Sequence, residues 1–268
     1  MIRSTLILLL LLAGVIFCCG QQVGIQPATL DFHLSPGRTE AQVVKITNLS
    51  SQKMVFQLSL ADWLRDSTGA HQYFRADTLP HSCASWVKLE KNSIEILPGR
   101  SEDILIRLQG PSDAQAFQQM KWAMLFLQSA PEQDNTAHKN KETETKIQQL
   151  LRVGIHIYQT PPSVTNSGAA RAVALREAPD EKNAYDFSMI NTGGTMLQCK
   201  VHLELTSIET GREIRSDIIE FPVFPEGKRV IRLKIPAATS SGKYSALAVL
   251  DIGEESSLEA IEKNIEVK

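Results

Sequence analysis

The sequence predicts an all-β protein with two immunoglobulin-like β-sandwich domains in tandem. Short runs of alternating apolar and polar residues recur along the chain, and Gly, Pro, Asn and Ser separate them. No long segment shows the 3.6-residue period of an amphipathic helix. The length of 268 residues suits two sandwiches of roughly 100 residues each.

The first twenty residues have the features of a secretory signal peptide. Arg3 gives a positive start, residues 6–17 form an apolar run, and small residues follow up to Gly20. The run is too short for a membrane span. Cleavage after Gly20 would leave Gln21 first and deliver the protein to the periplasm. The alternative is a lipoprotein acylated at Cys19.

The first domain is expected to span residues 21–159. Two similar turns, Leu34–Arg38 and Leu97–Arg100, each precede a new apolar strand, and Trp122–Leu127 is apolar on both faces, as in a central strand. Residues 62–82 are polar and turn-rich. Apolar alternation predicts further strands at Leu30–Leu34, Val44–Ile46, Met54–Leu60, Val87–Leu89 and Ile104–Leu108.

A polar segment and a long strand complete this domain. Residues 130–145 contain no apolar anchor, so we expect a mobile surface loop there. The strand that follows alternates Leu151, Val153, Ile155 and Ile157 on one side. Pro161 and Pro162 stop it, because proline cannot donate to a sheet ladder.

The second domain is expected to span residues 160–268 and repeats the style of the first. Residues 209–212 and 225–227 read as turns, and the tail at 258–267 favours a last strand over a short helix. Its remaining predicted strands lie at Tyr185–Met189, Leu197–Leu205, Val230–Ile235 and Tyr244–Leu250.

Composition and motifs argue against several functional classes. The formal net charge of −2 gives no reason to expect nucleic-acid binding. No catalytic signature is present, so we expect a protein that is not an enzyme and needs no cofactor or metal. The spacing of His71, His81 and Cys83 matches no standard metal site and favours a surface loop. The aspartates flanking that loop are expected to be solvated, namely Asp62, Asp66 and Asp77.

The remaining distinctive residues have ordinary structural interpretations. Cys83 and Cys199 fall in different predicted domains, so two buried thiols are favoured over a disulfide, which stays possible. Three tryptophans suggest core packing more than a ligand cleft, namely Trp63, Trp86 and Trp122. Asn48–Ser50 is a glycosylation triplet that we expect to be unmodified.

Three segments resemble the periplasmic pilus-assembly chaperones of the PapD-like type. They are an N-terminal strand at Val23–Leu34 followed by Ala41–Asn48, then Ile96–Leu108 with its Pro-Gly turn, and the strand ending Ile155–Tyr158 before the prolines. The resemblance implies a protein partner, an incomplete subunit of a surface fibre, whose groove the last strand fills. By position, the residues filling the groove are Ile147, Gln149, Leu151 and Val153.

The resemblance also implies a site that anchors the subunit's terminal carboxylate. The matching positions here hold Thr29 and His156, neither of which is a permanent cation. If His156 acts as imidazolium, partner binding should strengthen as pH falls through about 6.5, the unperturbed His value. The alternative is a structural or adhesive envelope module, since the first-half pattern also resembles the extracellular WxL-interacting proteins.

Overall fold

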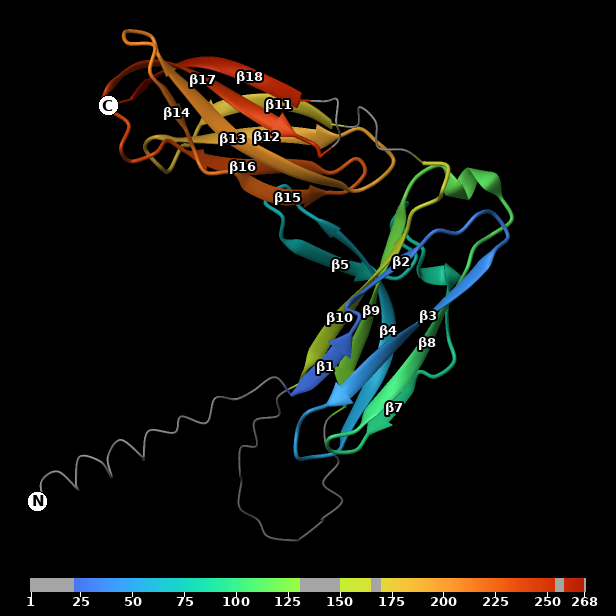
Figure 1. Cartoon of the computed structure of the whole chain (residues 1–268). Helices are drawn as coiled ribbons and strands as arrows, with labels where there is room; N and C mark the ends of the chain where they lie inside the picture. The colour runs from blue at the N-terminus through green and yellow to red at the C-terminus, as the bar shows by residue number, and fades with distance from the viewer. Residues whose placement is uncertain (1–21, 131–149, 165–169, 254–257, 268) are drawn as a thin grey trace, which may run out of the picture.

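The computed structural model describes residues 22–130, 150–164, 170–253 and 258–267. These residues form four β-sheets: two draw their strands from residues 23–159 and two from residues 170–267. Figure 1 shows the resulting two sandwiches meeting at an angle. The predicted all-β fold class is confirmed. Within the described ranges, no helix is long and apolar enough to cross a membrane.

The first sandwich packs a four-stranded sheet against a six-stranded one. The smaller sheet has the order β1 (Val23–Gln26), β3 (Thr39–Asn48), β8 (Ser101–Gln109) and β6 (Val87–Leu89). The larger sheet has the order β2 (Thr29–Phe32), β10 (Arg152–Gln159), β9 (Lys121–Ser129), β4 (Met54–Arg65) and β5 (His71–Arg75), and β7 (Ser93–Ile96) pairs with the start of β4. Two short 3₁₀ turns, η1 (Ala84–Trp86) and η2 (Ala114–Phe117), lie in the connections.

The second sandwich packs a three-stranded sheet against a five-stranded one. The smaller sheet has the order β11 (Ala170–Glu177), β12 (Ala184–Asn191) and β16 (Lys228–Lys234). The larger sheet has the order β14 (Glu213–Arg215), β13 (Leu197–Ser207), β17 (Gly242–Asp251) and β18 (Leu258–Val267), with β15 (Ile219–Val223) also on β13. The chain's tail is therefore a strand, as expected.

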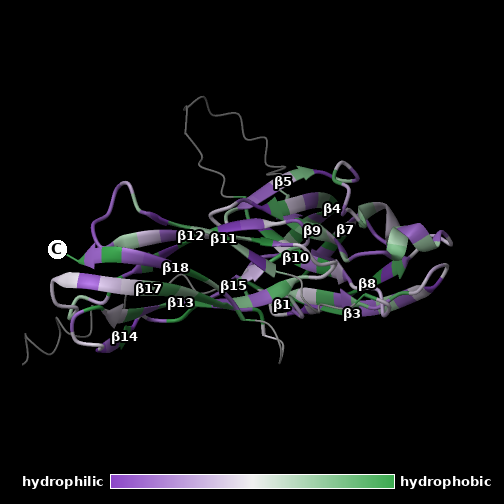
Figure 2. Cartoon of the chain, turned by 90° about the horizontal axis from the view of Figure 1, so that it is seen from above, coloured by the Kyte–Doolittle hydropathy of each residue, from purple (hydrophilic) through white to green (hydrophobic). Residues whose placement is uncertain are grey.

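Each sandwich buries its own apolar core, built from alternate residues of the facing sheets. Figure 2 shows hydrophobic and hydrophilic residues interleaved along the strands of both domains. The central position of β9 explains its continuous apolar run, since β10 and β4 flank it and residues 122–127 are all buried. Cys83 and Cys199 are buried free thiols, so the disulfide alternative is excluded.

A buried asparagine closes the same kind of turn in both domains. Asn48 is fully buried, and its Nδ2 donates to the carbonyls of Gln52 and Ile96 at 2.7 and 2.9 Å. Asn191 is fully buried as well, and its Nδ2 donates to the carbonyls of Thr195 and Val223 at 2.8 and 2.9 Å. Both amide protons of Asn48 are thus used inside the fold, and the expectation that the triplet is unmodified stays a prediction.

The N-terminal strand differs from its prediction as one continuous element. β1 pairs antiparallel with β3 in the smaller sheet, whereas β2 pairs parallel with β10 in the larger sheet. The chain therefore crosses from one sheet to the other between Gln26 and Thr29. This crossing decides how much of β10 is covered by a neighbour.

Candidate functional site: an open strand edge and the domain junction

The first half of β10 has a partner strand on one side only. β9 pairs with all of β10 from Arg152 to Gln159. β2 begins to pair at His156, whose backbone N–H donates to the carbonyl of Ala28 at 3.0 Å. Among the described residues, no strand pairs with residues 152–155 on the β2 side. Figure 1 shows β10 at this margin of the sandwich.

The backbone groups at this open edge follow from the alternation of the ladder. The N–H of His156 points to β2, and the N–H of Leu151 points to β9, where it donates to Ser129 Oγ at 2.9 Å. Successive residues of a strand direct their N–H and C=O groups to opposite sides. Those of Arg152 and Gly154 therefore point to the open edge and are available to an added strand.

The side chains predicted to fill a partner's groove continue the row of the core. Ile155 and Ile157 are fully buried, whereas Leu151 and Val153 are half-buried. Strand donation requires that Leu151 be free to enter a partner. In the structure its side chain packs against the core of the first domain, and its backbone carbonyl accepts a hydrogen bond from Ser129. Ile147, Gln149 and the predicted loop 130–145 lie outside the described residues, apart from Ala130.

On the opposite face of β10, side chains of β9 fill the space beside Gly154. A Cβ on Gly154 would lie 2.7 Å from Met124 Sδ and 3.3 Å from the ring of Phe126. The guanidinium of Arg152 stacks on Phe126, 3.6 Å from the ring centroid. The lack of a side chain at Gly154 thus lets β9 fill this face, and the open edge offers backbone groups and one row of side chains.

The two predicted anchor positions lie side by side. Thr29 and His156 are register partners in the β2–β10 pair, Thr29 exposed and His156 half-buried. The imidazole of His156 lies edge-on to Trp63 at 5.0 Å between ring centroids, and its Nε2 is buried without a hydrogen-bond partner. The two positions that the resemblance implies are therefore neighbours in the structure.

Arg65 and His71 join this cluster, and sequence reasoning missed both. The ring of His71 lies 5.8 Å from that of His156 and 4.9 Å from that of Trp63, and the guanidinium of Arg65 lies 5.9 Å from the Trp63 ring. His71 Nε2 and Arg65 Nε are buried and unpartnered, like His156 Nε2. Such nitrogen atoms can donate to an anion. His71 is thus not in a surface loop with His81 and Cys83, and the described residues contain no cluster of potential metal ligands.

Burial favours the neutral form of both imidazoles. Burial lowers the pKa of His156, and the charges of His71 and Arg65 lower it further. Burial and then Arg65 lower the pKa of His71. Both are thus more readily neutral in the fold than in the unfolded chain. Without an anion, a protonated His156 requires a pH lower than the 6.5 expected from sequence.

Stability should therefore fall as the pH drops below about 6.5, the value of an unperturbed His. Above that value both states hold neutral imidazoles. Below it the unfolded chain takes up protons that the folded chain resists, so the stability is lost as pH falls through the lowered pKa values. The unfolding free energy of wild type and of a His71→Gln/His156→Gln variant, measured between pH 5 and 8, checks this. An unchanged difference between the two proteins over that range would contradict it.

Beside this cluster, aromatic side chains from both domains form a third core. Trp63 contacts Phe224 of the second domain at 5.0 Å between ring centroids, and Trp122 and Tyr158 contact the same ring at 4.9 and 5.8 Å. This agrees with packing roles for Trp63 and Trp122, while Trp86 packs against Phe117 within the first domain. The junction is therefore an apolar contact between the sandwiches.

Asp62 is buried, which contradicts the expectation that it is solvated. Its side chain is 1% exposed. It accepts hydrogen bonds from the backbone N–H groups of Asp77, Thr78 and Leu79 at 3.2, 2.7 and 2.8 Å and from Ser82 Oγ at 2.6 Å. A carboxylate with these donors is satisfied without water. Asp62 therefore organises the loop that faces the second domain, whereas Asp77 is exposed and Asp66 half-buried.

Comparisons with known proteins find solved structures of similar architecture. No model of a protein family matches the chain, and no curated protein sequence does. A solved structure of a chaperone–tip adhesin complex of CFA/I fimbriae biogenesis is similar over 91% of this chain and 98% of the matched chain, at 10% identity and a TM-score of 0.50. The chain has a PapD-like two-sandwich fold.

Two further solved structures are similar at lower scores. The class 5 fimbriae chaperone CfaA covers 90% of this chain and 98% of its own, at 10% identity and a TM-score of 0.48. A chaperone–tip adhesion subunit complex, CsuC–CsuE of the archaic Csu pili of Acinetobacter baumannii, covers 92% and 98%, at 12% identity and a TM-score of 0.48.

Proposed function

We propose that this protein is a periplasmic assembly chaperone that binds an incomplete subunit of a surface fibre by strand donation. The observation that carries the proposal is the open edge at residues 152–155, where β2 stops pairing with β10. An added strand would bond to the outward N–H and C=O groups of Arg152 and Gly154, which supplies affinity. The function requires no catalytic group or cofactor.

The row of apolar side chains would supply selectivity. Leu151, directly before β10, packs against the core of the first domain, and Val153 lies on the same side of the strand by alternation. Alternate side chains on this side would meet the groove of a partner. Ile147 and Gln149 would extend this row by the same alternation. Because Leu151 is half-buried before any partner arrives, a partner would complete a core that the free protein leaves partly open.

The subunit's terminal carboxylate would bind at the cluster of Arg65, His71 and His156. These three side chains hold buried nitrogen atoms without hydrogen-bond partners. The cluster adjoins the pairing of Thr29 with His156, where the resemblance expects the anchor. Arg65 would provide the permanent cation that neither Thr29 nor His156 provides.

Co-expression with a fibre-type subunit encoded beside the gene tests the proposal. A stable one-to-one complex recovered from the periplasm, with the subunit degraded or aggregated when expressed alone, is the expected result. A subunit that is equally soluble and folded alone, and does not copurify, would contradict the chaperone function and favour a structural module of the envelope.

A further inference from the structure

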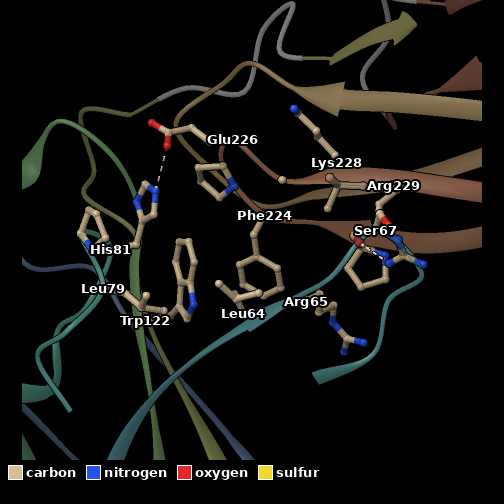
Figure 3. Close-up of a pocket in the computed structure, with 15 residues that line it drawn as sticks. Leu64, Arg65, Ser67, Leu79, His81, Trp122, Phe224, Glu226, Lys228 and Arg229 are labelled. Carbon is tan, nitrogen blue, oxygen red and sulfur yellow. Dashed lines mark hydrogen bonds and ion pairs between the residues drawn. The ribbon is translucent and has the colours of Figure 1, made fainter. Parts of the chain in front are cut away.

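A cavity of about 400 Å³ lies at the junction of the two domains (Figure 3). Its apolar walls are formed by Leu64 and Trp122 of the first domain and by Phe224 of the second, and three prolines line it as well: Pro80, Pro222 and Pro225. Its volume lies within the range of about 300–1,000 Å³ that small-molecule sites occupy. The open edge of β10 is not part of it.

The walls of the cavity include flat aromatic surfaces. His81 stacks on Trp122 at 4.7 Å between ring centroids with 10° between planes, and Trp122 meets Phe224 at 4.9 Å. Figure 3 shows His81 beside Trp122, with a dashed line from His81 to Glu226. His81 Nε2 lies 3.4 Å from the carboxylate of Glu226. These surfaces suit a planar apolar ring.

The charges lining the cavity are mainly positive. Arg65, Lys228 and Arg229 contribute cations, whereas Glu226 is the single acid among the lining residues and faces His81. Asp66 lies near Arg229, but its carboxylate accepts hydrogen bonds from Thr68 and from the loop backbone. The cavity therefore has positive charge to offer an anion.

Arg229 is the most buried of these three cations. It is 8% exposed, and its guanidinium donates to the carbonyls of Pro222 and Thr68 at 3.2 and 3.3 Å, while Nε has no partner. Gly69 (φ +99°) packs against it so closely that a Cβ there would lie 2.5 Å from Nη2. The guanidinium also lies 5.3 Å from the centroid of the Phe221 ring and interacts with the charge of Asp66, but its hydrogen bonds go to carbonyls and none to a carboxylate. Buried charges are ordinarily paired more directly.

A lining residue holds a buried donor without an acceptor. Arg229 Nε is buried and unpartnered, and a guanidinium N–H can only donate. His81 Nδ1 is buried and unpartnered as well, but His81 Nε2 faces the carboxylate of Glu226, so Nδ1 of the neutral ring is an acceptor. Buried polar atoms are nearly always bonded in a complete structure, so Arg229 Nε points to a missing acceptor.

We propose that this cavity binds a small aromatic carboxylate of one or two fused rings, with its ring against Trp122 and Phe224 and its carboxylate at Arg229. The ligand adds to the contact between the sandwiches, since it touches both domains. The proposal is independent of strand donation at β10, and either can fail without the other.

Isothermal titration calorimetry of the full protein with naphthalene-2-carboxylate tests it, with naphthalene-2-methanol as the neutral probe of similar size. The acid should bind at least about tenfold more tightly than the alcohol, because charge-assisted hydrogen bonds are the stronger ones. Arg229→Gln should remove that tenfold preference. Lys234→Gln, which removes the same charge from an exposed site on β16, should preserve it.

Equal binding of acid and alcohol, no binding of the acid at millimolar concentration, or full acid affinity in Arg229→Gln would each overturn the proposal. If Arg229→Gln does not fold, nuclear Overhauser effects in the wild-type protein decide. Contacts between naphthoate protons and the rings of Trp122 and Phe224 support the site, and contacts confined to other residues overturn it.

Discussion

Replacing Asp62 with alanine should lower the free energy of unfolding of the first domain by about 3 kcal/mol, since buried donors that lose a charged acceptor go unsatisfied. Four donors converge on this carboxylate, three of them backbone N–H groups of residues 77–79. Chemical denaturation followed by tryptophan fluorescence measures the effect, because Trp63, Trp86 and Trp122 all lie in the first domain. Trp86 packs within that domain, whereas the other two also contact Phe224 of the second.

Asp103→Ala provides the matched control for Asp62→Ala. Asp103 is an exposed residue of β8, so its loss should change the unfolding free energy by no more than about 0.5 kcal/mol. Equal stability of the two variants would show that the loop at residues 77–82 does not depend on the buried carboxylate.

Replacing Arg152 with proline should weaken partner binding at least about 100-fold, which is about 2.7 kcal/mol. The N–H of Arg152 points to the open edge, so proline there removes a donor that an added strand would use and places its ring in the path of that strand. The folded protein should lose less than about 1 kcal/mol, because edge strands tolerate proline where the N–H is unpaired. Titration of the partner subunit, with melting curves, measures both quantities.

Two variants at the same strand separate backbone from side-chain effects. Arg152→Ala removes the stacking on Phe126 but keeps the N–H. Because a stacking contact of this kind contributes about 0.5 kcal/mol, partner binding should stay within about threefold of wild type. Val153→Pro removes an N–H that points to β9 and should destabilise the fold itself. Unimpaired partner binding by a folded Arg152→Pro protein would contradict strand addition at this edge.

Local patterns predicted most of the strands and both glycine turns of the first domain. Gly37 and Gly99 have φ of +72° and +66°, as the two Pro-Gly turns require. Ile155 and Ile157 are core, and the tail from Leu258 to Val267 is a strand. Each of these features depends on residues close in sequence, so alternation and turn chemistry suffice to find them.

The missed features depend on contacts between distant segments. Residues 62–82 look polar, yet β4 runs to Arg65 and β5 pairs with it, which places His71 beside His156. Asp62 is buried because residues 77–82 fold over it. A resemblance by position found the neighbours Thr29 and His156, but nothing local marks Arg65 or Arg229 as residues of the domain junction.

The most direct test of the central claim is the exchange of single backbone amides along β10, followed by nuclear magnetic resonance in the free protein and in the complex with its subunit. In the free protein, the amides of Arg152 and Gly154 should exchange rapidly while those of Val153 and Ile155, which face β9, are protected. Addition of the subunit should protect Arg152 and Gly154 as well. Protection of these two amides in the free protein, or their continued rapid exchange in the complex, would contradict strand donation by β10.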